Sequence, residues 1–292
     1  MKLLSVAALA ALASVTALLS GCATTEGGVP IDTSYTSRGQ DSRALFLVIH
    51  YTVSNLQQSL KILTEQEVSA HYLLTDEARP RIYRLVDENR RAWHSGASAW
   101  MENRRLNSSS IGIEIVHPGA RTGPDGERIY LPFPQAQIDA LIPLVRDIVR
   151  RHQIKPERIL GHAEVSAQNK EDPGPTFPWR LFSQLGITPP WPDAARVAAQ
   201  RALFETTPPD IVWWQGALAL HGFEVQRTGL LDRQTERVLS SFQMRYRPAR
   251  YDGQPDAESA ALLHVLTTPA GAPEAAPALP MPVPAAAAVL PR

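Results

Sequence analysis

Polar residues stand at three places where the sequence otherwise predicts apolar side chains. His50 directly follows the apolar run of residues 44–49, and Glu114 stands inside the β-branched run of residues 111–116. A third polar cluster, residues 161–174, follows another short apolar run. A buried carboxylate is costly unless a cation or hydrogen-bond donors meet it. These positions are therefore the first candidates for chemistry.

The residue types at these places suit a catalytic metal. Zinc in enzymes takes three protein ligands from His and Asp or Glu and leaves one position open for water. His50, His162 and Asp172 can supply them if the strand ends converge. Glu114 would then be the general base, and Lys170 a cation beside the developing oxyanion. On spacing alone, a histidine at a strand end can equally be a hydrogen-bonded loop residue.

The elements that must position these residues form an α/β pattern. Apolar runs predict strands at residues 44–50, 81–86, 111–116 and 158–160. Helical periodicity follows at residues 56–67 and 138–149, and Pro143 inside the second stripe predicts a kink or a later start. Strands that alternate with helices indicate a sheet covered by helices.

Composition excludes several classes of protein. The 292 residues favour about two domains. The 29 basic and 29 acidic residues cancel, which argues against binding to nucleic acid by counterion release. A single cysteine excludes an internal disulfide framework and any multi-cysteine metal site. The absence of HExxH excludes a zincin site on a helix.

Both ends of the chain have unusual compositions. Residues 1–21 have the pattern of a secretory signal, and the residues before Cys22 resemble a bacterial lipobox. That resemblance implies a lipid on Cys22, a flexible tether over residues 22–39, and anchoring in the periplasm at the inner leaflet of the outer membrane. The alternative is an uncleaved membrane anchor. Residues 268–292 are rich in Ala and Pro and predict a disordered tail.

A succession of short motifs identifies the larger body. The chain contains, in order, HYT at 50–52, VSAHY at 68–72, AWH at 92–94, Asn107, SIGIE at 110–114, GH at 161–162 and KEDPGP at 170–175. This succession resembles the zinc-dependent N-acetylmuramoyl-L-alanine amidases of the amidase-2 family. The family shares its fold with T7 lysozyme and the peptidoglycan-recognition proteins. The resemblance implies a central mixed sheet flanked by helices over residues 40–187.

The resemblance also assigns roles to individual residues. It implies one Zn²⁺ per chain on His50, His162 and Asp172, with Glu114 and Lys170 as catalytic residues. Tyr72, His94 and Asn107 are predicted to contact substrate.

The implied reaction is hydrolysis of the amide between N-acetylmuramic acid and L-alanine, in cell-wall turnover or recycling. Peptidoglycan and muropeptides are then the partners, and the chain is expected to act as a monomer. Two alternatives stay open: a lipoprotein that binds peptidoglycan without cutting it, and a zinc hydrolase of another bond in the stem peptide.

A smaller body follows a connector at residues 188–208. Residues 209–267 contain three apolar helical patterns, with Asp232 and Asp256 as predicted N-caps. The repeated Gly/Asp turns before helices resemble the peptidoglycan-binding type 1 domain. This three-helix body is thus expected to bind the cell wall, or to serve only as a structural cap.

Overall fold

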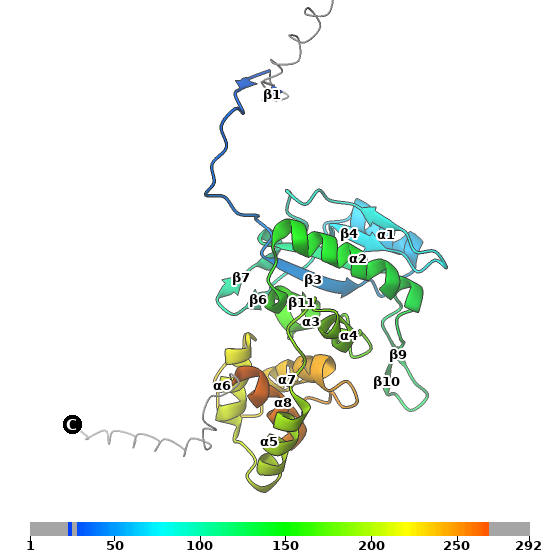
Figure 1. Cartoon of the computed structure of the whole chain (residues 1–292). Coiled ribbons are helices and arrows are strands. Elements are labelled where there is room, and N and C mark those ends of the chain that lie inside the picture. Colours follow the sequence, from blue (N-terminus) through cyan, green and yellow to red (C-terminus); the bar gives the residue numbers. More distant parts are fainter. Residues whose placement is uncertain (1–22, 25–27, 269–292) are drawn as a thin grey trace, which may run out of the picture. The chain divides into compact units, whose positions relative to one another are not determined.

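The computed structural model describes residues 23–24 and 28–268 and divides the chain into two units, residues 1–41 and 42–292 (Figure 1). In the first unit, β1 (Ala23–Thr24) pairs antiparallel with β2 (Pro30–Ile31). The predicted signal peptide, Cys22 and nearly all of the Ala/Pro-rich tail lie outside the described residues. No described helix is both long and apolar enough to cross a membrane.

A five-stranded mixed sheet forms the centre of the second unit. Its order is β11-β3-β8-β4-β5, with parallel pairing except between β4 and β5. The strands are β3 (Phe46–Tyr51), β4 (Tyr72–Leu74), β5 (Ile82–Arg84), β8 (Ser110–Ile115) and β11 (Ile159–Gly161). The predicted α/β class and all four predicted strands are confirmed. The three-residue β4 was not predicted.

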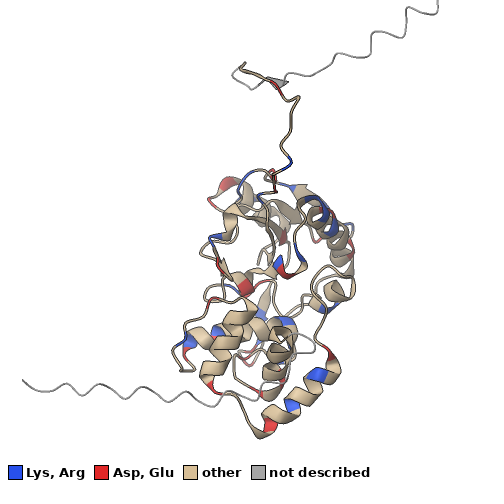
Figure 2. Cartoon of the chain, turned by 60° about the vertical axis from the view of Figure 1, so that its left-hand side comes forward, with Lys and Arg blue, Asp and Glu red and all other residues tan. Residues whose placement is uncertain are grey.

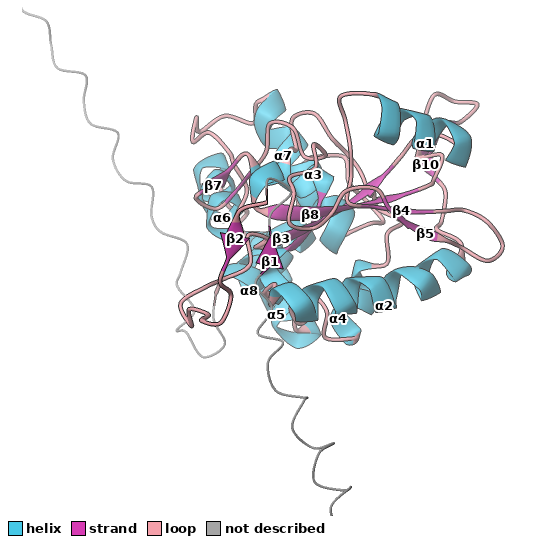
Figure 3. Ribbon diagram, turned by 90° about the horizontal axis from the view of Figure 1, so that it is seen from above, coloured by secondary structure: helices cyan, strands magenta, loops and turns pink. Residues whose placement is uncertain are grey.

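Alternation along the strands gives the sheet two different faces. Side chains at alternate positions of β3 and β8, such as Ile49 and Ile113, pack under α2 (Gln135–His152). The opposite face is covered in part by α1 (Leu56–Glu65), so the strands lie between the two helices (Figure 3). This second face carries the polar positions of β3 and β8, because residues of one parity along a strand share a face.

Helix α2 excludes one of the two predictions for Pro143. It begins at Gln135 and continues through the proline, so the later start is wrong. Proline removes one helical hydrogen bond, which frees the carbonyl of the residue four positions earlier. Both Pro143 and Asp139 are exposed, so water can satisfy that carbonyl.

Shorter elements lie between the strands of the sheet and the long helices. They are the hairpins β6–β7 (Ala99–Trp100, Asn103–Arg104) and β9–β10 (Ala120–Thr122, Arg128–Tyr130), with the helices α3 (His162–Val165) and α4 (Trp179–Gln184). Single 3-10 turns occupy Leu106–Ser108 and Pro156–Arg158.

The C-terminal helical body contains four helices: α5 (Ala194–Thr206), α6 (Ile211–His221), α7 (Arg233–Tyr246) and α8 (Ala257–Thr267). Each begins at an aspartate that accepts a backbone hydrogen bond, which confirms Asp232 and Asp256 as N-caps. Three of them lie in the predicted three-helix body, and α5, an Ala-rich helix predicted inside the connector, packs against α8.

The helical body shares a hydrophobic core with the sheet. Phe46 and Val48 of β3 and Leu160 of β11 are buried in the same cluster as Trp214 and Phe242 of the helical body. Apolar burial is worth about 25 cal/mol per Å², so this shared core makes the two bodies one folding unit.

Glu88 joins β4 to the end of α2. It accepts hydrogen bonds from the Tyr72 hydroxyl at 2.6 Å, from His152 at 2.9 Å and from Arg151. Burial opposes the ionised carboxylate, but the hydrogen bonds from Arg151, Tyr72 and His152 outweigh it and lower the pKa of Glu88 to about 2.

Because its folded pKa is depressed, Glu88 contributes stability above its unfolded pKa of 4.5, and that stability is lost as the pH falls towards 2. We expect the melting temperature to fall more steeply from about pH 6 to about pH 3 in the wild type than in Glu88→Gln. Glu65→Gln, at an exposed glutamate of α1, is the control and should keep the wild-type slope. Equal slopes for wild type and Glu88→Gln would contradict the prediction.

Candidate metal centre and cleft

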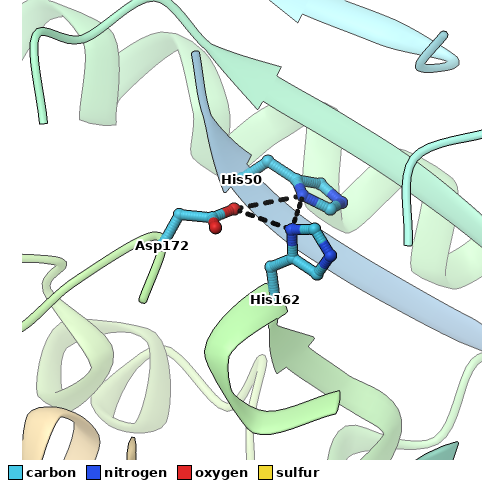
Figure 4. A group of neighbouring side chains, drawn as sticks. All are labelled: His50, His162 and Asp172. Atoms are coloured by element: carbon cyan, nitrogen blue, oxygen red, sulfur yellow. Dashed lines mark hydrogen bonds and ion pairs between the residues drawn. The ribbon is translucent and has the colours of Figure 1, made fainter. Parts of the chain in front are cut away.

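Two histidines and one aspartate converge beside the end of β3. His50 Nδ1 lies 2.9 Å from His162 Nδ1 and 3.1 Å from Asp172 Oδ2, and the latter two atoms are 3.2 Å apart. All three side chains are buried and point towards one another (Figure 4). The sequence-predicted ligands therefore lie together, from segments more than one hundred residues apart.

The sheet explains why these residues meet. β3 and β11 are adjacent and parallel, with Ile49 paired to Gly161, so His50 and His162 follow neighbouring strand positions. The Ala163 N–H donates to the Asp172 carbonyl at 2.8 Å, which holds the third segment against the first turn of α3. A Cβ on Gly161 would lie 2.6 Å from Pro173, so only glycine permits this approach.

A chain of hydrogen bonds fixes the tautomer of His50. The Ser110 hydroxyl lies 2.6 Å from the Leu106 carbonyl, which can only accept, so Ser110 donates there. Ser110 Oγ must then accept from His94 Nε2 at 3.0 Å. That leaves His94 Nδ1 as the acceptor for His50 Nε2–H at 2.9 Å. In neutral His50, the remaining nitrogen Nδ1 carries no proton.

The unprotonated Nδ1 of His50 faces a carboxylate oxygen at 3.1 Å, and a cation between them would remove the repulsion of their lone pairs. Burial, with the His162 charge, lowers the pKa of His50 to about 4, so protonation of His50 does not remove the conflict near neutral pH. Burial opposes ionisation of Asp172, but His162 and His50 outweigh it and lower its pKa. Tetrahedral zinc, with bonds of about 2.0 Å, places its ligand atoms about 3.3 Å apart. The donor set fits such an ion.

Glu114 lies beside this centre on the same face of the sheet. The register of β3 and β8 pairs it directly with His50. Its Oε2 is buried and has no hydrogen-bond partner among the described residues. Burial and the charge of Asp172 raise the pKa of Glu114 to about 8, although Lys170 acts in the opposite direction. Such a carboxyl group can take up and release a proton near neutral pH.

These groups open into a cavity of about 620 Å³. Its lining includes Glu114, His162, Lys170 and Asp172, together with the loop at residues 51–54 and part of α7. A metal ligand set, a carboxyl group and a lysine thus share one cavity, which is the arrangement that metal-assisted hydrolysis requires.

Comparisons with known proteins agree with this geometry. A family profile described as N-acetylmuramoyl-L-alanine amidase (Amidase_2) matches residues 40–175. The N-acetylmuramoyl-L-alanine amidase AmiD of Escherichia coli (strain K12) is 42% identical over 262 residues, 85% of this chain and 93% of AmiD. The chain belongs to this amidase family. The family predicted from the motifs is therefore confirmed.

Solved structures support the same family membership. AmiD from E. coli, in complex with the substrate anhydro-N-acetylmuramic acid-L-Ala-D-gamma-Glu-L-Lys, is similar with a TM-score of 0.73 and 40% identity, covering 83% of this chain and 96% of that one. AmpDh3 from Pseudomonas aeruginosa has a TM-score of 0.73 and 35% identity, covering 82% and 96%. The similarity thus extends well beyond residues 40–175 into the helical body.

The three predicted substrate residues of the amidase have different surroundings. His94 lines the cavity, but both its ring nitrogens are engaged by His50 and Ser110. Tyr72 and Asn107 do not line the cavity. Tyr72 donates to Glu88, and Asn107 Oδ1 accepts from the backbone N–H of His94 at 3.0 Å. Both residues thus make supporting hydrogen bonds in the structure, and their contact with substrate stays a prediction.

Sequence reasoning missed two residues that support His94. Ser110 fixes its tautomer, and Gly112 makes room for its ring, because a Cβ on Gly112 would lie 2.5 Å from His94 Cγ. An isolated glycine in a β-branched strand is a signal for close approach of another group. The motif Ser110–Glu114 therefore combines the catalytic carboxylate with both supports of the His50 partner.

The amidase holds the start of α3 through a buried ion pair with the helical body. Glu164 accepts from the Gly161 N–H at 2.7 Å, directly before His162. Arg245 of α7 donates to both Glu164 oxygens, at 2.9 and 2.8 Å, and to the Ile159 carbonyl at 3.2 Å. Only 6% of the Arg245 side chain and 4% of Glu164 are exposed, so each charge depends on the other for compensation.

We expect Ser110→Ala to weaken metal binding by about 10- to 100-fold, because loss of a group that orients a ligating histidine typically has this effect. Competition with a chromophoric chelator measures the affinity. Ser259→Ala, which removes a similarly buried serine from α8, is the control and should bind metal as the wild type does. Unchanged affinity in Ser110→Ala would remove the serine from the metal centre.

Removal of Arg245 should leave the Glu164 charge buried and unpaired. We expect Arg245→Met to lower the free energy of unfolding by about 3–5 kcal/mol, and Arg245→Met with Glu164→Gln to lose less, as urea denaturation would measure. If the double variant is no more stable than the single one, the ion pair is not the cause of the loss.

Proposed function

We propose that this amidase holds one zinc ion on His50, His162 and Asp172 and hydrolyses the amide bond between N-acetylmuramic acid and L-alanine in peptidoglycan or its muropeptides. The observation that carries the proposal is the pair of acceptors, His50 Nδ1 and Asp172 Oδ2, that face each other at 3.1 Å and that a metal cation would bridge. The anhydromuramic peptides bound in the structures of AmiD and AmpDh3 support the substrate class.

Zinc, when bound, supplies Lewis-acid chemistry that polarises the amide carbonyl and makes water more acidic. Glu114 accepts the proton of the attacking water, because its carboxyl group opens into the cavity and its Oε2 has no competing partner among the described residues. Glu114 then returns the proton to the departing amine of L-alanine. Lys170, exposed at the cavity, stabilises the negative charge that develops on the carbonyl oxygen.

A protein that only binds peptidoglycan has no use for this arrangement. Keeping the Glu114 carboxyl group buried and partnerless among the described residues costs free energy that binding alone does not require. Lys and Arg are interspersed with Asp and Glu along the described elements (Figure 2), which suits a mixed peptide and sugar substrate better than a polyphosphate.

In the same proposal, the chain is a periplasmic lipoprotein that acts as a monomer. A lipid on Cys22 anchors it to the inner leaflet of the outer membrane. The lipobox-like residues before Cys22 support the anchor, and the exposure of residues 28–41 suits a tether between membrane and enzyme.

We expect Glu114→Gln to keep its zinc but to lose turnover by about 10²- to 10⁴-fold, because the amide cannot accept the proton of water. Metal analysis and a muropeptide hydrolysis assay measure the two quantities. Glu67→Gln, at an exposed glutamate, should retain wild-type turnover. Substantial activity in Glu114→Gln would exclude Glu114 as the base.

The decisive assay follows the products of muropeptide hydrolysis by mass spectrometry, with and without a chelator. Release of the intact stem peptide, lost with chelator and restored by zinc, supports the proposal. Cleavage inside the stem peptide would indicate a zinc hydrolase of another bond. Binding without any cleavage would indicate a peptidoglycan-recognition protein.

A further inference from the structure

One face of α7 forms a wall of the catalytic cavity. Arg237, Ser240, Ser241 and Met244 all line it. Their spacing of i, i+3, i+4 and i+7 places them on one side of a helix. The smaller body therefore contributes side chains to the cavity that contains Glu114 and Lys170, although it lies outside the residues that the family profile matches.

The position of this wall is fixed on its other side and near both ends. Val238, Leu239 and Phe242 of α7 are buried in the core of the helical body. Towards the start of the helix, the Gln168 side chain donates to the Gln234 carbonyl at 3.1 Å, and Arg237 donates to the Gln168 carbonyl. Near the end, Arg245 holds Glu164. Both attachments lie on the segment that carries His162, Lys170 and Asp172.

Among the basic side chains that line the cavity, Arg237 has no acidic partner in the described part of the chain and is therefore available to a ligand. Arg128 is paired with Glu171. No ion pair between described residues involves Lys170 or Arg237. Arg237 is exposed, and one of its five N–H donors is used by the Gln168 carbonyl, which leaves four that suit the two oxygens of a carboxylate.

We propose that Arg237 binds a carboxylate of the stem peptide, and that α7 thereby orients the peptide side of the scissile amide. This inference rests on the proposed function, since it assumes that muropeptides enter the cavity. A γ-linked glutamyl residue has a free α-carboxylate, so even a short stem peptide carries the group that Arg237 would recognise. The helical body is then part of the substrate site of the enzyme.

The test compares two muropeptides that differ only at the second residue of the stem, which is γ-linked glutamate in one and its α-carboxamide in the other. Both are offered to the full chain. We expect Arg237→Ala to lower kcat/KM for the carboxylate substrate by about tenfold, mostly through KM, because a hydrogen bond to a charged group is lost. The carboxamide substrate should be affected far less. A merely structural role for Arg237 would lower both values equally.

Arg233→Ala is the matched control, because Arg233 is exposed on the same helix but does not line the cavity. It should preserve the wild-type preference for the carboxylate. If Arg237→Ala also preserves that preference, the proposal is wrong while the amidase function stands.

A binding measurement separates the proposal from catalysis. In the Glu114→Gln background, calorimetry should show about tenfold weaker binding of the carboxylate substrate after Arg237→Ala. Equal affinities with and without Arg237 would overturn the proposal even if turnover had changed. A wild-type chain that neither binds nor cleaves muropeptides would overturn both this inference and the proposed function.

Discussion

The structure depends on a buried cluster of two histidines and one aspartate whose facing acceptor atoms a metal cation would bridge. His50 Nδ1 and Asp172 Oδ2 face each other at 3.1 Å, and His162 completes the group. Their burial would be unfavourable in a chain that had no positive charge to place between them. The sheet register, the close approach at Gly161 and the ion pair of Glu164 all hold these three side chains in place. A metal ion bound here would therefore couple its binding to folding.

The support of the site extends in two directions from the ligands. Through His94 and Ser110 it reaches the Leu106 carbonyl, so a backbone group three hydrogen bonds away determines which nitrogen of His50 is free. Through Glu164 it reaches Arg245, which belongs to the helical body. The hydrogen bonds through His94 and Ser110 fix the position of the proton on His50. The ion pair of Glu164 and Arg245 fixes the backbone before His162.

Much of the fold and site could be predicted because the relevant signals are local. The strand around His50 and the strand around Glu114 are short apolar runs, and the motifs that contain the ligands are contiguous. The hydrogen-bond partners of Tyr72 and Asn107 could not be predicted, because they come from other segments. The packing of α5 against α8 could not be predicted either, because the apolar residues of α5 show only weak helical periodicity. Helix α2 passes through Pro143 because the freed carbonyl faces solvent, which is a property of the fold and not of the helix.

The core shared by the sheet and the helical body limits how such chains can be shortened over evolutionary time. A gene that ended before α5 would leave Phe46, Val48 and Leu160 uncovered, as one apolar surface on the same face of the sheet as the metal site. Exposed apolar surface of this kind favours aggregation. A compact descendant would first need polar residues at these positions, or a new segment to cover them. The boundary at residue 175, where the family profile ends, is thus a boundary of sequence similarity and not a point at which this protein can be divided.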